Sequence, residues 1–286
     1  FAEDSSRAHG LALMLVPMFR PIIDGPVPLH LIEAPVQGTG KSLLARVCLS
    51  ATLGHVSATT VPKDEDEWRK QITSGLLAGA PVMFLDNVMG TLRSESLAAV
   101  LTETEWTGRM LGQSLLVKVP NTAVWVATAN GARMSKDIVR RTLHIKLDSQ
   151  LEDPELRTEF KHPDIVRFAK DNRLMVLSAL VSIVRAWVDA GKPLSAQKMG
   201  SYESWSGVIG GCLEACGVPG FLTNRAELYS SANEEHELWT RIVEAWAEAY
   251  GDSAVTPKEL LENIQDKDLL AEAIGDKAGA AAANAF

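Results

Sequence analysis

The sequence predicts an α/β protein: a parallel sheet of about five strands flanked by helices, followed by an all-helical region. Three apolar runs, at residues 29–34, 82–85 and 122–128, are each typical of a buried strand, and each leads into a polar or glycine-rich segment. Strand-like runs at 55–61 and 143–147 complete the five. The carboxyl ends of parallel strands meet at one edge of a sheet, so we expect the three segments to form one site.

Four regions are expected along the chain. Residues 1–28 hold a lead-in helix that ends at Arg20 and Pro21, and residues 29–150 form the α/β core. Residues 151–250 carry helical patterns. Residues 251–286 begin like a small helical or winged unit and end in an alanine-rich tail that we expect to fray. Because the chain starts at Phe1 and not at a methionine, we expect it to be a fragment of a longer protein.

The composition is that of an ordinary globular protein, with 46% hydrophobic and 22% charged residues among 286. The longest apolar run, residues 11–19, is too short to span a bilayer, so we expect no membrane segment. Three cysteines without a disulfide framework favour a reducing, cytoplasmic location. A net charge of −8 argues against a generally basic nucleic-acid binder, but it leaves room for a ring whose basic residues face a central channel.

The segment PVQGTGKSL at residues 35–43 has the order of a phosphate-binding P-loop between a strand and a helix. Gly38 and Gly40 let backbone N–H groups turn towards a phosphate, Lys41 reaches the β- and γ-phosphates, and the Ser42 hydroxyl binds Mg²⁺. Pro35 replaces the usual first glycine. We therefore expect ATP and Mg²⁺ as ligands, with these nucleotide-binding residues: Pro35, Val36, Gln37, Gly38, Thr39, Gly40, Lys41, Ser42 and Leu43.

Asp86 follows the second apolar run and is expected at the carboxyl edge of the sheet, where it would hold the magnesium ion. The next residue is Asn87, and an amide cannot act as the base that activates water. Hydrolysis would then need Asp86 alone or another carboxylate. Three candidates remain open: Glu33, Glu65 and Glu67.

Asn130 ends the third run, where its amide could orient a water molecule or the γ-phosphate; a simple Asn-Gly turn is the alternative. Arg140 and Arg141 lie near the end of a short predicted helix. Such arginines usually complement the helix dipole, but in a ring ATPase they are candidates for an arginine finger that acts on the neighbouring subunit.

Residues 106–120 contain two extended segments around Gly112 and Gln113, a pattern typical of a β-hairpin. Its basic and amide side chains are candidates for contact with DNA: Arg109, Gln113 and Lys118.

These motifs in this order resemble the AAA+ ATPase superfamily. More narrowly, they resemble the ATPase part of primase–helicase proteins of phages and mobile elements, which are similar to superfamily 3 helicases. The matching segments are 33–42, 68–72, 76–82, 84–88, 125–130, 137–141, 160–164, 185–187 and 204–206.

The resemblance implies a P-loop AAA+ core of three layers with a helical lid. Lys41 and Ser42 would belong to Walker A, Asp86 to Walker B, and Asn130 would be sensor 1. Arg140 or Arg141 would be the arginine finger, and residues 109–118 would be a hairpin in a DNA channel. The sensor 2 arginine stays open between Arg167, Arg173 and Arg185. The implied partners are single-stranded DNA, further copies in a ring, expected to be a hexamer, and a primase domain in the full-length chain.

Three functions follow as hypotheses. The first is an ATP-driven DNA helicase or translocase in replication of a phage or mobile element. The second is an AAA+ loader or remodeller of a protein partner, which the acidic net charge favours. The third is a module that binds ATP without hydrolysing it, which Asn87 favours.

Overall fold

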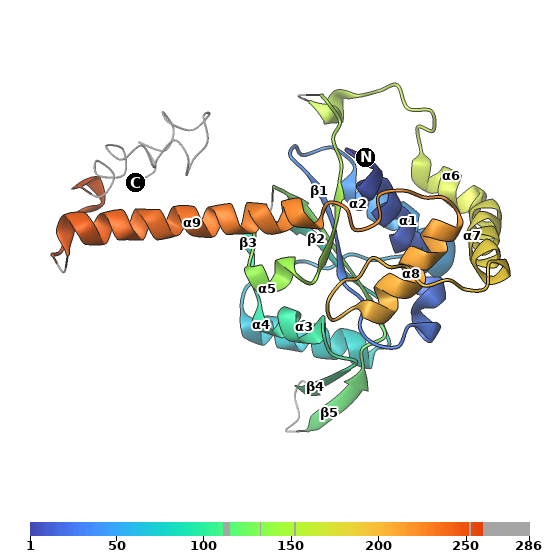
Figure 1. Ribbon diagram of the computed structural model, residues 1–286, viewed down its shortest axis with the longest axis horizontal. Coiled ribbons are helices and arrows are strands. Elements are labelled where there is room, and N and C mark those ends of the chain that lie inside the picture. Colours follow the sequence, from blue (N-terminus) through green and yellow to red (C-terminus); the bar gives the residue numbers. More distant parts are fainter. Residues whose placement is uncertain (111–114, 132, 152, 252, 260–286) are drawn as a thin grey trace. The chain divides into compact units, whose positions relative to one another are not determined.

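The computed structural model describes residues 1–286 except 111–114, 132, 152, 252 and 260–286 (Figure 1). The chain divides into two compact units, Phe1–Ala226 and a second unit that begins at Glu227. Helix α9 (Arg225–Tyr250) supplies most of what is described of the second unit. Nowhere in the described parts of the chain is a helix both long and apolar enough to cross a membrane.

A parallel sheet forms the centre of the first unit, as predicted for an α/β protein. Its strands lie in the order β2 (Val82–Val88), β6 (Val124–Asn130), β1 (Leu29–Ala34) and β8 (Thr142–Lys146). All three pairings are parallel. The register places Ala34 beside Asn130, so the chain leaves β1 and β6 at the same level of the same edge.

The expectation of five strands is wrong for the described residues, because the sheet has four. Residues 55–61 contribute only Thr59, which forms an isolated bridge with Leu85 at the β2 edge. Thr59 donates its N–H to Phe84 O at 2.7 Å and accepts from Asp86 N at 3.0 Å. Beyond this bridge Pro62 has no N–H to donate, and the chain turns into a helix at residue 65, so the ladder cannot extend.

Helices α1 (Asp4–Phe19), α2 (Lys41–Leu53), α7 (Arg173–Asp189) and α8 (Glu203–Ala215) pack with the sheet into one hydrophobic core. Leu13, Leu15 and Val16 of α1 are fully buried, so the first helix is part of the core. The short helices α6 (Ile165–Asp171), η1 (Arg20–Ile22) and η2 (Pro154–Leu156) flank this group.

Helices α3 (Glu65–Leu77), α4 (Glu95–Val100) and α5 (Lys136–Val139) lie in another part of the unit, below and to the left of the sheet in Figure 1. Asp64 is the N-cap residue of α3, since its side chain accepts from Glu67 N at 2.9 Å. A small two-stranded sheet, β3 (Thr91–Leu92) with β7 (Arg133–Met134), lies close to α4 and α5.

The predicted hairpin is present as β4 (Glu105–Arg109) and β5 (Leu116–Pro120), paired antiparallel at the bottom of Figure 1. Its turn, with Gln113, lies outside the described residues. The base of the hairpin is held on α3, since Trp106 Nε1 donates to Thr73 Oγ1 at 2.8 Å. A Cβ on Gly108 would lie 2.3 Å from the same Thr73 oxygen, so only glycine fits there.

Candidate functional site

A glycine loop, residues 35–40, connects β1 to α2. Gly38 and Gly40 adopt left-handed backbone angles, with φ of +73° and +88°, which glycine takes without steric cost. The Thr39 hydroxyl donates to Val36 O and closes the loop on itself. Gly40 is the N-cap residue of α2, and no side chain caps that end of the helix. The loop therefore leads into a helix N-terminus whose N–H groups and dipole favour an anion.

The side chains of Lys41 and Asn130 contact each other next to this loop. Lys41 is 8% exposed, and its ammonium donates to Val36 O at 3.2 Å and to Asn130 Oδ1. Desolvation by burial lowers the pKa of Lys41, while the charges of Asp86 and Glu33 oppose this shift. The contact between the loop lysine and the strand-end amide follows from the parallel register of β1 and β6.

Asp86 is held by two hydroxyl groups. Its Oδ1 accepts from Ser42 Oγ at 2.5 Å and from Thr128 Oγ1 at 2.5 Å. The sequence analysis missed Thr128, although it lies two residues before Asn130 and so shares a face of β6 with it. Oxygen atoms of serine and aspartate are suitable ligands for Mg²⁺, so Ser42 and Asp86 are the residues that would hold this ion.

A cavity of about 440 Å³ opens over these groups. Its lining combines loop, helix and strand ends: Gln37, Gly38, Gly40, Lys41, Ser42, Leu43, Arg46, Asn87, Thr128 and Asn130. Asp86 bonds to two of these residues but itself lines a larger neighbouring cavity of about 1060 Å³, bordered by residues 58–65. Of the predicted nucleotide-binding residues, Pro35, Val36 and Thr39 line neither of these two cavities; Val36 acts through its carbonyl group.

A third cavity, which is apolar and has a volume of about 350 Å³, adjoins the 440 Å³ cavity and shares Gly38, Gly40 and Leu43 with it. Its other lining residues come from four parts of the first unit: Phe1, Thr39, Leu44, Val47, Leu147, Pro154, Arg157, Phe160 and Ile165. The Arg157 guanidinium lies 5.0 Å from the centre of the Phe160 ring. None of these residues from Leu147 onward was predicted to be a site residue, because no chemical motif appears in that part of the sequence.

Asn87 follows Asp86 near the end of β2. Its φ is +58°, its N–H donates to Thr128 Oγ1 at 2.8 Å, and its Oδ1 accepts from Asn130 Nδ2 at 3.3 Å. The alternative carboxylates have other partners. Glu33 bonds to His144 Nε2, Glu65 accepts from the N–H groups of Glu95 and Ser96 at 3.0 and 3.1 Å, and Glu67 pairs with Lys70 at 2.7 Å.

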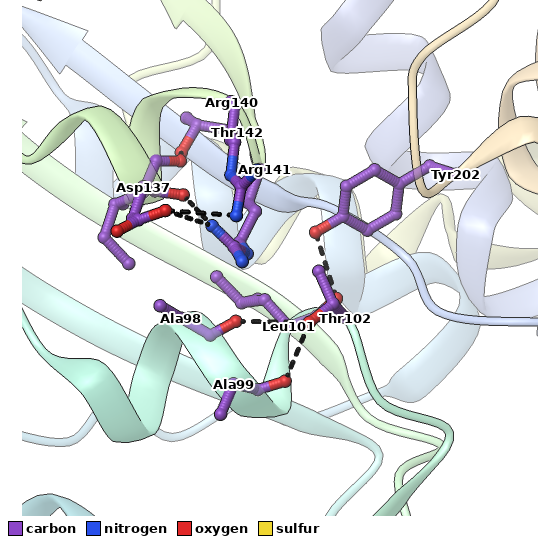
Figure 2. Close-up of polar contacts among 10 residues, drawn as sticks. Ala98, Ala99, Leu101, Thr102, Asp137, Arg140, Arg141, Thr142 and Tyr202 are labelled. Atoms are coloured by element: carbon purple, nitrogen blue, oxygen red, sulfur yellow. Dashed lines mark hydrogen bonds and ion pairs between the residues drawn. The ribbon is translucent and has the colours of Figure 1, made fainter.

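Figure 2 shows that Asp137 binds both predicted arginines. Its Oδ1 lies 3.1 Å from Arg140 NH2 and 3.2 Å from Arg141 NH1. The Arg141 side chain is only 11% exposed, whereas that of Arg140 is 55% exposed. Neither arginine lines the two cavities at the glycine loop. The structure therefore does not bring them together with Lys41 and Asp86 in one chain.

Other predicted residues also lie away from these cavities. On the hairpin, Arg109 and Lys118 are exposed, and Lys118 pairs with Glu105 at 2.5 Å. Arg173, one of the open sensor candidates, donates to Ala51 O at the end of α2. The other two candidates form exposed ion pairs within their own helices, Arg167 with Asp171 and Arg185 with Asp189.

Comparison of the sequence with protein-family models and with curated proteins finds no match to either. The functional conclusion therefore depends on the geometry of the site. That geometry combines a glycine loop, a buried ammonium group, a hydroxyl–carboxylate pair and an adjoining apolar cavity.

Proposed function

We propose that this chain binds ATP together with Mg²⁺ at the glycine loop and hydrolyses it. One observation carries the proposal: Lys41, Ser42, Asp86 and Asn130, from the three elements α2, β2 and β6, converge at the N-terminus of α2. In this assignment Lys41 neutralises the β- and γ-phosphates, Ser42 and Asp86 hold the cation, and the Asn130 amide orients the terminal phosphate or the attacking water.

The adjoining apolar cavity supports a nucleotide over a simple phosphate ion. A nucleotide needs a polar compartment for its phosphates and an apolar one for its base, and the two cavities meet at Gly38, Gly40 and Leu43. A ligand that runs from one cavity to the other passes over the glycine loop, where backbone N–H groups are available.

Within this proposal, the chain acts as an ATP-driven motor on single-stranded DNA, as a hexameric ring joined to a primase domain in the full-length protein. The hairpin supports a contact with DNA, because Arg109 and Lys118 are exposed on strands held by α3. Arg140 supports assembly, since it is exposed and lies outside the cavities of its own chain, as expected for an arginine that acts on a neighbouring copy.

Phosphate release as a function of protein concentration, with and without single-stranded DNA, tests the proposal. We expect specific activity to rise with concentration, because an arginine from a second copy completes the site, and to rise again with DNA. Lys41→Ala should abolish turnover, whereas Lys70→Ala, which removes an exposed lysine from the surface of α3, should not. Turnover that ignores DNA would favour the protein remodeller, and turnover that persists in Lys41→Ala would refute the site.

A second candidate function is an ATP-binding module that does not hydrolyse its ligand. The observation that favours it is the lining of the 440 Å³ cavity, in which the described residues supply the Asn87 amide and no carboxylate. Tight ATP binding without phosphate release at any protein concentration would establish this function. Steady turnover that disappears in Asp86→Asn would exclude it.

A further inference from the structure

Arg46 is a charged residue of the site to which the sequence analysis gave no role. It lies on α2, one helical turn after Ser42, and it lines the 440 Å³ cavity together with Lys41 and Asn130. Its NH2 group lies 3.8 Å from Asp86 Oδ2. The side chain is 47% exposed, so it has room to move at the rim of the cavity.

The two oxygens of Asp86 have different partners. Oδ1 accepts from Ser42 and Thr128, both neutral hydroxyls, whereas Oδ2 faces the Arg46 guanidinium. Lys41 directs its ammonium group to carbonyl oxygens, those of Val36 and Asn130. Among the described residues, Arg46 is therefore the cation that pairs with Asp86 Oδ2, at 3.8 Å and so without a direct hydrogen bond.

We propose that Arg46 neutralises the charge of Asp86 through this ion pair, and that it releases the carboxylate when a divalent cation binds there. This inference rests on the proposed function. Ser42 and Asp86 would hold a divalent cation, whose charge would repel a guanidinium group on the same side.

The exchange has a consequence for binding. Without Mg²⁺, Arg46 compensates the negative charge of Asp86 beside the phosphates. In Arg46→Ala that charge is uncompensated and repels the nucleotide, until Mg²⁺ binds and takes over the compensation. Loss of Arg46 should therefore weaken ATP binding in the absence of Mg²⁺ more than in its presence.

The test is a fluorescence titration with ATP that carries an N-methylanthraniloyl group on its ribose, once in EDTA and once in excess Mg²⁺. For Arg46→Ala we expect the ratio of Kd in EDTA to Kd in Mg²⁺ to rise about threefold, as for a half-exposed ion pair. Arg46→Lys keeps the charge and should stay near the wild type. Arg7→Ala is the matched control, because it removes an arginine from an exposed ion pair on α1, away from the site.

Two outcomes overturn the inference alone. If Arg46→Ala weakens binding equally in EDTA and in Mg²⁺, Arg46 contacts the nucleotide and does not exchange with the cation. If it changes neither Kd, Arg46 has no role in binding. Failure of the proposed function looks different, because then the wild type itself binds no labelled ATP under either condition, and the inference fails with it. Circular dichroism of each variant verifies that it is folded.

Discussion

Gly38→Ala should destabilise the first unit by more than the cost of placing an alanine in a left-handed backbone conformation. At Gly38 φ is +73°, which costs an alanine about 1 kcal/mol. The new Cβ would also lie 2.9 Å from Glu155 Cβ and 3.1 Å from Glu155 N, so η2 would have to shift. Overpacking of this kind costs about 2 kcal/mol, and we expect a total loss of about 3 kcal/mol in the free energy of unfolding.

The matched control is Gly40→Ala. Gly40 has a similar φ of +88°, but a Cβ there meets no heavy atom within 4 Å, so only the backbone cost of about 1 kcal/mol is expected. Urea unfolding, followed by tryptophan fluorescence, measures both variants. Equal losses in the two variants would refute the contact between the loop and η2.

A double mutant separates the contact from other effects. In the Gly38→Ala background, Glu155→Gly removes the nearest carbon, and it should restore about 1 kcal/mol relative to the sum of the two single changes. If the two changes are simply additive, the two segments do not touch. The result also bears on the site, because Pro154, the first residue of η2, lines the apolar cavity next to the loop.

The remaining predictions concern the arginines, the hairpin and the buried histidines. Arg141→Ala should lower the free energy of unfolding by about 2 kcal/mol, because it removes a mostly buried charge-assisted hydrogen bond. The exposed Arg140 should matter less, and Arg140→Ala should cost less than about 1 kcal/mol. Equal losses of the two variants in urea unfolding would contradict this. Trp106→Phe keeps an aromatic ring but loses the hydrogen bond to Thr73 on α3, so it should lower the free energy of unfolding by about 1 kcal/mol. It should also speed amide hydrogen exchange in β4. Unchanged exchange would argue that this hydrogen bond does not hold the hairpin on α3. Burial lowers the pKa of His9 and of His30 to about 4, so each binds a proton more weakly in the folded than in the unfolded state. Stability is then complete above pH 6.5 and decreases as pH falls towards 4, by about 1.4 kcal/mol per pH unit for each histidine. Unfolding between pH 7 and 5 should show a shallower decrease in His9→Gln, and an unchanged slope would contradict the assignment.

Local sequence patterns were enough to predict which segments meet in the site. The glycine loop, the start of α2 at Lys41, and Asp86 and Asn130 near the ends of apolar strands can each be recognised within about ten residues. Because the strands of the sheet are parallel, these segments must lie at the same edge of the sheet. The contact between Lys41 and Asn130 is therefore a consequence of patterns that the sequence contains.

Other features needed the packing of distant segments. The wall of the apolar cavity combines Phe1 with residues around Phe160, and nothing in either segment alone indicates the other. Glu33 is a candidate base by sequence, but only the structure shows that it pairs with His144 on β8. Arg140 and Arg141 are adjacent in the sequence and chemically identical, and only their burial distinguishes them.

By itself, the sequence determined the fold class and the chemical segments, because strand periodicity, glycine position and helix starts are local properties of the chain. The tertiary structure alone decided that the sheet has four strands in its described part, and that Thr128 and Arg46 share the Asp86 carboxylate with Ser42. The physical reason is that strand register and side-chain packing depend on contacts between residues far apart in the chain, for which local patterns carry no signal.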